Sequence, residues 1–219
     1  MKTLFSLATL LVAVLTGRAQ GSVEAMLNYV PTVPSDSSPL YSSIFSSIYG
    51  PVGWTFQPLT GMDVTALGAF NYLVPPTGSL EVGLWNANGT LLASQTITDA
   101  SALVNLSRYQ SIAPVLLAAD QTYYLAAYIP VGTLSAVVVT PGSDPNGYAT
   151  LSGAVQLGQV AYNSNAGFVF PATLDGVGGD AIIAPNFEYE VVPEPAAVDL
   201  LGVGSLVGLL AWRGTFRRG

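Results

Sequence analysis

Short apolar runs alternate with turn-forming residues through the middle of the chain, between residues 52 and 192. The runs recur at intervals of roughly 8 to 12 residues, and no stretch keeps a helical period over three turns. In residues 80–85 and 187–191, every second residue is apolar or aromatic, which gives each run one buried and one wet face. The pattern predicts an all-β fold, in which two antiparallel sheets pack about 10 Å apart as a jelly-roll-like β-sandwich.

The strands expected in this region are joined by Gly, Pro, Asn and Asp. They cover residues 53–57, 62–70, 80–85, 90–97, 109–112, 122–129, 135–140, 156–162 and 182–192. The sequence Asn-Ala-Asn-Gly at 86–89 predicts a hairpin, because Asn and Gly adopt positive φ readily. Residues 35–47 hold seven serines among apolar side chains and predict a long loop over the sandwich, and residues 140–147 predict a second loop.

The first 19 residues have the pattern of a secretory signal peptide. Lys2 gives a positive start, residues 4–15 are apolar, and small or polar residues follow up to Ala19. Cleavage is expected after Ala19, and cuts after Gly21 or Ala25 also fit the pattern. A buried N-terminal helix is the alternative, which the absence of a polar face disfavours.

The C-terminal end contains an apolar segment of 17 residues, 196–212. As a helix it would be about 25 Å long, near the short limit for crossing a bilayer. Arginines follow the segment and glutamates precede it, so we expect the tail to lie in the cytoplasm. The alternative is a buried core helix that ends in a surface turn, although the Pro-Glu-Pro sequence before the segment argues against it.

A proline-flanked glutamate, a glycine-rich apolar span and a terminal arginine cluster follow one another at this end, and this order resembles a PEP-CTERM sorting signal. By position, the sorting motif is Pro193, Glu194 and Pro195, the transmembrane helix is 196–212, and the basic stop is Arg213, Arg217 and Arg218. The resemblance implies a bacterial protein that crosses the inner membrane and is held there by its tail. An exosortase would then remove the tail and pass the protein to the cell surface or extracellular matrix.

The body carries a second, separate resemblance. The sequences GWTF at 53–56, VTALG at 64–68, EVGLW at 81–85, GTLLAS at 89–94 and YYLAAY at 123–128 are similar to an uncharacterised β-sandwich domain of exported bacterial proteins. That domain is often found ahead of a tail of this kind. The resemblance implies the fold, and it brings no activity with it.

The charge of the body excludes several classes of function. Between residues 21 and 192, Arg108 is the single basic residue against eleven acidic ones, which gives a net charge of −10. Duplex nucleic acid is excluded as a direct partner, because its binding requires several basic side chains. The whole chain has no His and no Cys, so disulfides, thiol nucleophiles, His-based triads and His or Cys zinc sites are excluded as well.

Three sets of residues offer candidate chemistry in the body. Asp175 and Asp180 flank a glycine-rich run that could wrap a calcium ion, although an ordinary loop is the favoured interpretation and no cofactor is expected. Trp54 and Trp85 could stack against sugar rings, with Trp85 the more exposed of the two, although packing in the core is favoured. The eleven carboxylates could supply an acid and base pair for glycoside hydrolysis, but no spacing singles out a pair.

The sequence therefore predicts four parts: a signal peptide at 1–19, an N-terminal strand and Ser-rich loop at 20–51, the β-sandwich at 52–192 and the sorting signal at 193–219. We expect a non-catalytic structural or binding protein of the cell surface or matrix. Its expected partners are the secretion machinery, an exosortase and the membrane, with extracellular polysaccharide as a further candidate. The alternative is a carbohydrate-binding or carbohydrate-active protein that uses exposed aromatics and paired carboxylates.

Overall fold

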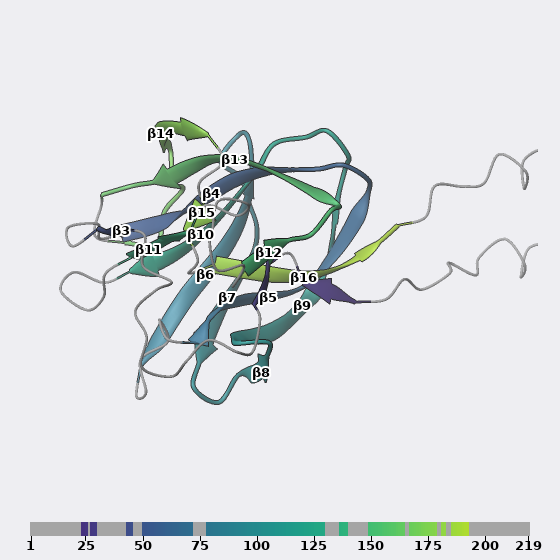
Figure 1. Cartoon of the computed structure of the whole chain (residues 1–219), viewed down its shortest axis with the longest axis horizontal. Coiled ribbons are helices and arrows are strands. Elements are labelled where there is room, and N and C mark those ends of the chain that lie inside the picture. The colour runs from purple at the N-terminus through teal and green to yellow at the C-terminus, as the bar shows by residue number, and fades with distance from the viewer. Residues whose placement is uncertain are drawn as a thin grey trace, which may run out of the picture. The chain divides into compact units, whose positions relative to one another are not determined.

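Two antiparallel sheets contain most of the strands in the computed structural model (Figure 1). The structure describes residues 23–25, 27–29, 43–45, 50–71, 78–129, 136–139, 149–164, 167–178, 181–182 and 185–192. The prediction of an all-β fold is confirmed for this part of the chain, which contains no α-helix. None of its segments forms a helix with the length and hydropathy needed to cross a membrane.

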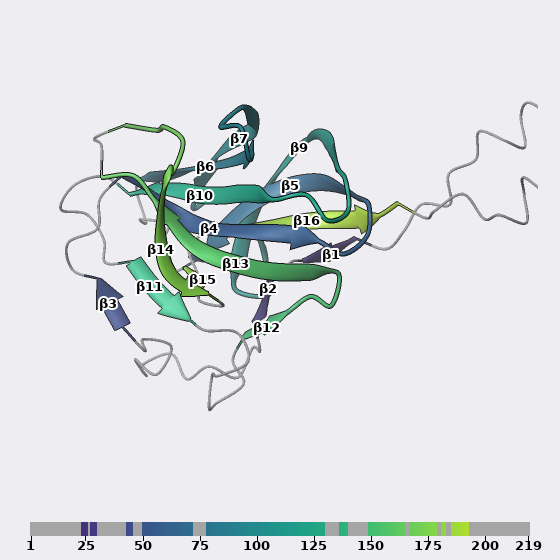
Figure 2. The ribbon, with the colours of Figure 1, turned by 90° about the horizontal axis from the view of Figure 1, so that it is seen from above.

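The larger sheet has six strands, and its central strands lie side by side in Figure 2. In spatial order they are β14 (Thr173–Gly178), β13 (Val155–Tyr162), β4 (Gly50–Pro58), β10 (Tyr123–Ile129), β6 (Ser79–Asn86) and β7 (Leu91–Thr98). The second sheet has five strands. Their order is β1 (Glu24–Ala25), β16 (Pro185–Val191), β5 (Met62–Phe70), β9 (Ser107–Leu117) and β8 (Ala102–Val104).

Two smaller sheets complete the described strands. One consists of β15 (Ala181–Ile182), β11 (Ala136–Val139) and β3 (Ser43–Phe45), and the other of β12 (Ala149–Leu151) and β2 (Leu27–Tyr29). Strand β3 falls within the predicted Ser-rich loop, so that segment is a strand at this point.

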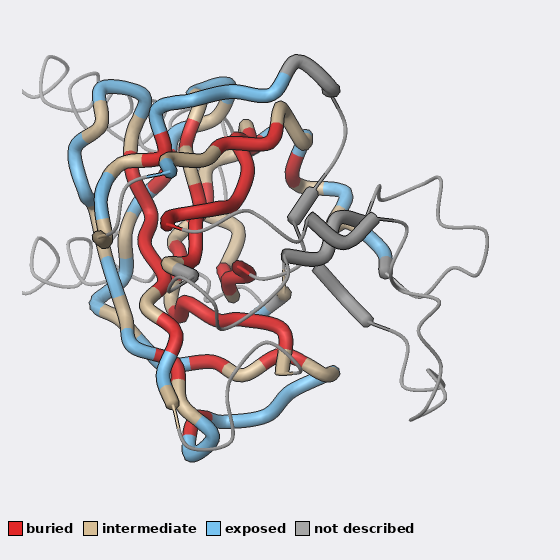
Figure 3. The backbone as a smooth tube through the Cα atoms, turned by 90° about the vertical axis from the view of Figure 1, so that its left-hand side faces the viewer, coloured by how far each residue is buried: buried red, intermediate tan, exposed pale blue. Residues whose placement is uncertain are grey.

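Alternate residues of both main sheets form one shared core, which appears as the buried stretches at the centre of Figure 3. From β4 the core receives Val52, Trp54 and Phe56, and from β16 it receives Phe187 and Tyr189. The indole ring of Trp54 stacks on Phe187 with 6.5 Å between centroids, and Phe56 lies 5.1 Å from Phe187. The period of two read from the sequence therefore places aromatic rings from both sheets in contact.

Most strand bounds agree with the sequence to within one residue, including those of the exposed β7, whereas the largely buried β4 extends beyond the predicted 53–57 at both ends. Strand β5 has the bounds that were predicted. Strand β9 is longer than the predicted 109–112, and the expected strand 182–192 is two strands, β15 and β16. Strands β8 and β14 were not predicted, because their residues are mostly exposed and lack the apolar alternation of a buried strand.

The predicted hairpin between β6 and β7 is confirmed. The Oδ1 atom of Asn86 accepts hydrogen bonds from the backbone N–H groups of Asn88 and Thr90, each at 3.0 Å. Gly89 has a φ of 79°, a conformation that glycine adopts without steric cost. The turn thus fixes the antiparallel pairing of β7 with β6.

Arg108, the single basic residue of the body, has a structural role. Its Nε donates to Oδ1 of Asn71 at 2.6 Å, and its Nη1 donates to the backbone carbonyl of Ser101 at 2.8 Å. These bonds tie the end of β5 to the turn that precedes β8. The guanidinium therefore connects separate backbone segments.

Leu116 and Leu117 allow a direct test of the inward and outward faces of β9. Leu117 is 0% exposed and Leu116 is 60% exposed. We expect Leu117→Ala to lower the free energy of unfolding by about 2 to 5 kcal/mol, because it leaves a cavity in the core. Leu116→Ala should change it by about 0.5 kcal/mol or less. Urea denaturation of both variants measures the difference, and equal effects would contradict the assigned faces.

Candidate functional site

The outer face of the six-stranded sheet carries a cluster of aromatic side chains. Trp85 of β6 and Tyr124 of β10 are cross-strand neighbours. Phe168 lies 5.2 Å from the Trp85 ring, and Phe170 lies 4.7 Å from the Tyr124 ring, measured between centroids. Both phenylalanines belong to the segment that follows β13, so this segment covers part of the sheet.

Neither predicted tryptophan presents a ring face to solvent. Trp54 lies in the core and is fully buried. Trp85, which the sequence favoured as the more exposed of the two, is 3% exposed, because Phe168 and Phe170 lie against it. The structure thus agrees with the favoured interpretation that both rings are packed, and in this conformation neither ring is available for stacking on a sugar.

A small hollow lined by both polar and apolar residues lies on the same outer face, where Tyr124 pairs with Thr55 of its lining. It has a volume of about 160 Å³, and none of the described residues that line it is charged. Its lining includes Thr55, Gln57, Thr122 and Gln156, and Nε2 of Gln57 donates to Oγ1 of Thr122 at 3.1 Å. Amide and hydroxyl groups of this kind can both donate to and accept from a neutral polyhydroxylated ligand.

A β-bulge in β13 shapes one wall of this hollow. The pairing of β13 with β4 shifts register between Leu157 and Val160. The Thr55 hydroxyl accepts a hydrogen bond from the N–H of Gln159 at 2.8 Å and donates to its carbonyl at 3.3 Å. The two hydrogen bonds of Thr55 therefore stabilise the bulge. Gln57 and Thr122 remain at the rim of the hollow.

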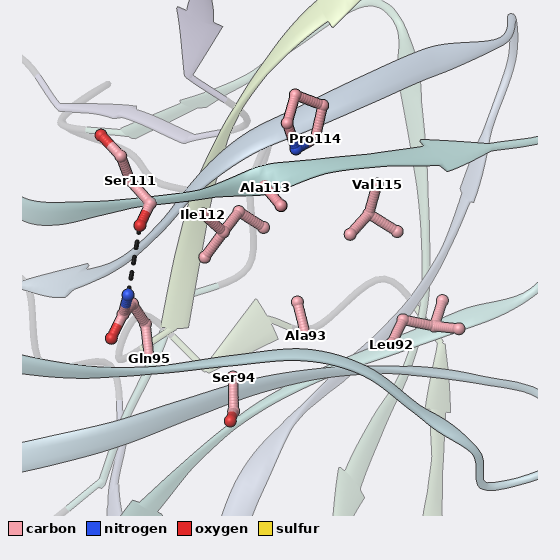
Figure 4. A pocket seen from close by; sticks show the side chains of 9 residues that line it. All are labelled: Leu92, Ala93, Ser94, Gln95, Ser111, Ile112, Ala113, Pro114 and Val115. Carbon is pink, nitrogen blue, oxygen red and sulfur yellow. Dashed lines mark hydrogen bonds between the residues drawn. The ribbon is translucent and has the colours of Figure 1, made fainter.

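A larger open hollow lies between β7 and β9, with a volume of about 610 Å³ (Figure 4). Its lining is uncharged and consists of Leu92, Ala93, Ser94, Gln95, Ser111, Ile112, Ala113, Pro114 and Val115. Figure 4 shows Gln95 and Ser111 joined across one end of it, by a hydrogen bond of 3.1 Å from Nε2 to the Ser111 carbonyl. Sequence analysis did not identify this site, because its two walls belong to different sheets and no local pattern shows that they face each other.

Sheet pairing places carboxylates together that the sequence could not pair. Asp63 of β5 lies opposite Glu190 of β16, and Glu188 is the next residue of β16 on the same face. Burial raises the pKa of the Glu188 carboxyl. Burial also raises the pKa of Tyr109, a hydrogen bond with Ser107 lowers it, and the charge of Glu188 raises it further. The described residues place no three acidic side chains where they could share a metal ion.

The remaining predicted site residues are distributed as follows. Asp175 is exposed on β14, in the run that the sequence assigned to a loop. Its expected calcium partner Asp180 lies outside the described residues, as do the sorting motif Pro193, Glu194 and Pro195 and the basic stop Arg213, Arg217 and Arg218. The calcium site and the sorting signal stay predictions.

Comparison with protein families gives one match. The family model described as a domain of unknown function (DUF4082) matches residues 39–175, which is more than half of the chain. The match includes strands of both main sheets, from β4 through β13. No curated protein matches the sequence.

The pKa of Glu188 predicts a pH-dependent effect on stability. Because the folded chain holds this proton more tightly than the unfolded chain, the stabilisation is present in acid and is lost as the pH rises through the raised pKa. We expect Glu188→Gln to raise the melting temperature at about pH 7 and to leave it unchanged at about pH 3.5, where both states are protonated. Calorimetry at the two pH values measures this, and a lower melting temperature at neutral pH would contradict it.

Proposed function

The chain belongs to the DUF4082 family, a domain of unknown function. We propose that it is a non-catalytic structural or binding protein of the bacterial cell surface or extracellular matrix. In this proposal the body is a jelly-roll-like sandwich between a signal helix and a C-terminal transmembrane helix. The observation that carries the proposal is the order of motif, apolar span and arginines from residue 193 to 219. The proposed partners are the secretion machinery, an exosortase and the membrane.

The chemistry of the body supports a role without catalysis. The guanidinium of Arg108 donates hydrogen bonds to Asn71 and to the Ser101 carbonyl. The single cation of the body is therefore already engaged in structural contacts. With no His in the chain and no Lys in the body, serine and threonine hydroxyls have neither of these two side chains to activate them. Binding through neutral polar and apolar surfaces is the chemistry that these residues favour.

The sorting proposal is tested by the mass of the mature protein in a bacterium that contains an exosortase. We expect the wild-type chain to lose its tail beyond the motif, and Glu194→Gln to retain it, because the motif lacks its carboxylate. Glu190→Gln on β16 is the matched control and should be processed normally. A wild-type chain that keeps its tail would indicate a membrane-tethered periplasmic protein and contradict the sorting proposal.

Carbohydrate binding is the second candidate function, and the hollow beside Tyr124 is the observation that favours it. Gln57, Thr122 and Gln156 offer amide and hydroxyl groups without charge, next to a partly exposed aromatic ring. This combination suits a neutral sugar better than an anionic one. The paired carboxylates Asp63 and Glu190 would be needed only by a carbohydrate-active version of this function.

Affinity electrophoresis with neutral polysaccharides tests this second candidate. We expect Gln57→Ala to weaken retardation by about two- to tenfold, as expected from the loss of one hydrogen bond of about 0.5 to 1.5 kcal/mol. Gln110→Ala, an exposed position on β9, is the matched control and should bind as the wild type does. If no neutral polysaccharide retards the wild-type protein, this candidate fails.

A further inference from the structure

Strand β7 is an edge of the six-stranded sheet, and no strand among the described residues pairs with its second side. It is the last strand in the sheet order, and its eight residues, Leu91–Thr98, contain no charge and no proline. The bulge in its pairing with β6 lies at its start, which leaves Ala93 to Thr98 in regular register. Its side chains are largely accessible, and Leu91 is 45% exposed. An edge of this kind offers unpaired backbone groups to another strand.

The other long edges in the described part of the two main sheets carry features that prevent such pairing. Strand β14 has the exposed Asp175, and the free part of β9 contains Pro114. Strand β16 carries Glu190 beyond its short pairing with β1. Charge and proline are the usual protection of a sheet edge, so β7 is the edge without it.

The Gln95 side chain shows that the β7 edge accepts amide groups. The backbone N–H of Thr96 donates to Oε1 of Gln95 at 3.1 Å, and Nε2 of Gln95 donates to the Ser111 carbonyl at 3.1 Å. A side-chain amide has the same O=C–N atoms as a peptide unit. The Oε1 atom of Gln95 therefore occupies the position at the Thr96 N–H that a backbone carbonyl of an added strand would occupy, and such a strand would displace it from that N–H.

The residues of β7 make it complementary to a second copy of itself. Ser94, Thr96 and Thr98 face outward on alternate positions, opposite the outer-face residues of β6. In an antiparallel pair of two β7 strands, a two-fold axis places residues of the same face opposite each other. Hydroxyl side chains would then meet hydroxyl side chains on the outer face, a pairing that stabilises sheets.

Charge selects the direction of the pairing. Asp99 follows β7 directly, and each body carries a net charge of −10. Parallel in-register pairing would bring the two Asp99 residues about 5 Å apart. Antiparallel pairing around the middle of β7 separates them by about 30 Å, several times the Debye length of about 8 Å at physiological salt.

We propose that β7 pairs antiparallel with β7 of a second copy, which joins the two six-stranded sheets into one continuous sheet. On this side of β7, the hollow separates Leu92–Gln95 from Ser111–Val115 of β9 (Figure 4). The inference deepens the proposed structural role and rests on it for its biological meaning. Its test uses the purified chain. The pairing of β7 can therefore fail this test while the proposed export and sorting hold, and it can pass while they fail.

Single cysteines provide the test, because the chain has none of its own. The full-length protein in mild detergent is given one cysteine at each position from 91 to 98 in turn and is oxidised gently. We expect the yield of disulfide dimer to peak at one position. Moving the cysteine by two residues separates the two thiols by about 14 Å along the strands, beyond the Cα distance of about 7 Å that a disulfide allows.

The opposite edge of the same sheet provides the matched control. Thr173→Cys on β14 is exposed and lies on an edge strand, as Thr96→Cys does, and should give only background dimer. Association through the apolar tails would treat both variants alike. The proposal would be overturned if no position along β7 gave more dimer than the others. Equal dimer yields at positions 96 and 173 would also overturn it, even if β7 cysteines captured a different protein.

A charge on the edge provides an independent measurement. Thr96→Asp should abolish the dimer in sedimentation experiments, because it places two carboxylates near each other across the two-fold axis. Thr173→Asp should leave the dimer intact. A dimer that survives Thr96→Asp would show that the contact lies elsewhere.

Discussion

The burial of alternate side chains between two sheets is the constraint on which the rest of this structure depends. The first residues of β5 show it clearly, since Met62 and Val64 are buried and Asp63 and Thr65 are not, while β4 at the centre of its sheet is buried on both faces. The Nε1 atom of Trp54 has no hydrogen-bond partner among the described residues, at a cost of roughly 1 to 3 kcal/mol. Burying an indole of about 150 to 250 Å² contributes roughly 4 to 6 kcal/mol, so packing outweighs the unpaired donor.

The two outer faces of the sheets differ because different elements cover them. On the six-stranded sheet, Phe168 and Phe170 cover Trp85 and part of Tyr124, and a neutral hollow remains beside them. On the five-stranded sheet, Asn186 donates to the Tyr109 hydroxyl at 2.7 Å, and both side chains are buried. An outward position on a strand therefore does not by itself make a side chain available to a ligand.

Sequence analysis predicted the features of the fold that local residue patterns determine. It missed the features that depend on contacts between segments distant in the chain. The alternation in Met62–Phe70 fixed the bounds of β5, and the Asn and Gly of residues 86–89 fixed the hairpin. The burial of Trp85 depends on Phe168 and Phe170, about 80 residues further along the chain, so no local pattern contains it. The pairing of Asp63 with Glu190 is equally non-local, and it follows only from the order of β16 and β5 in the sheet.

The distribution of charge links the described surfaces. The carboxylates leave an acidic body whose single cation, Arg108, is fixed in a structural network. Attraction of an anionic partner would require cations that the body lacks, and an acidic surface repels other acidic surfaces. Recognition must then use hydroxyl, amide and backbone groups at uncharged places. The hollow beside Tyr124 and the edge of β7 are two such places, and each presents groups that can donate and accept hydrogen bonds without a net charge.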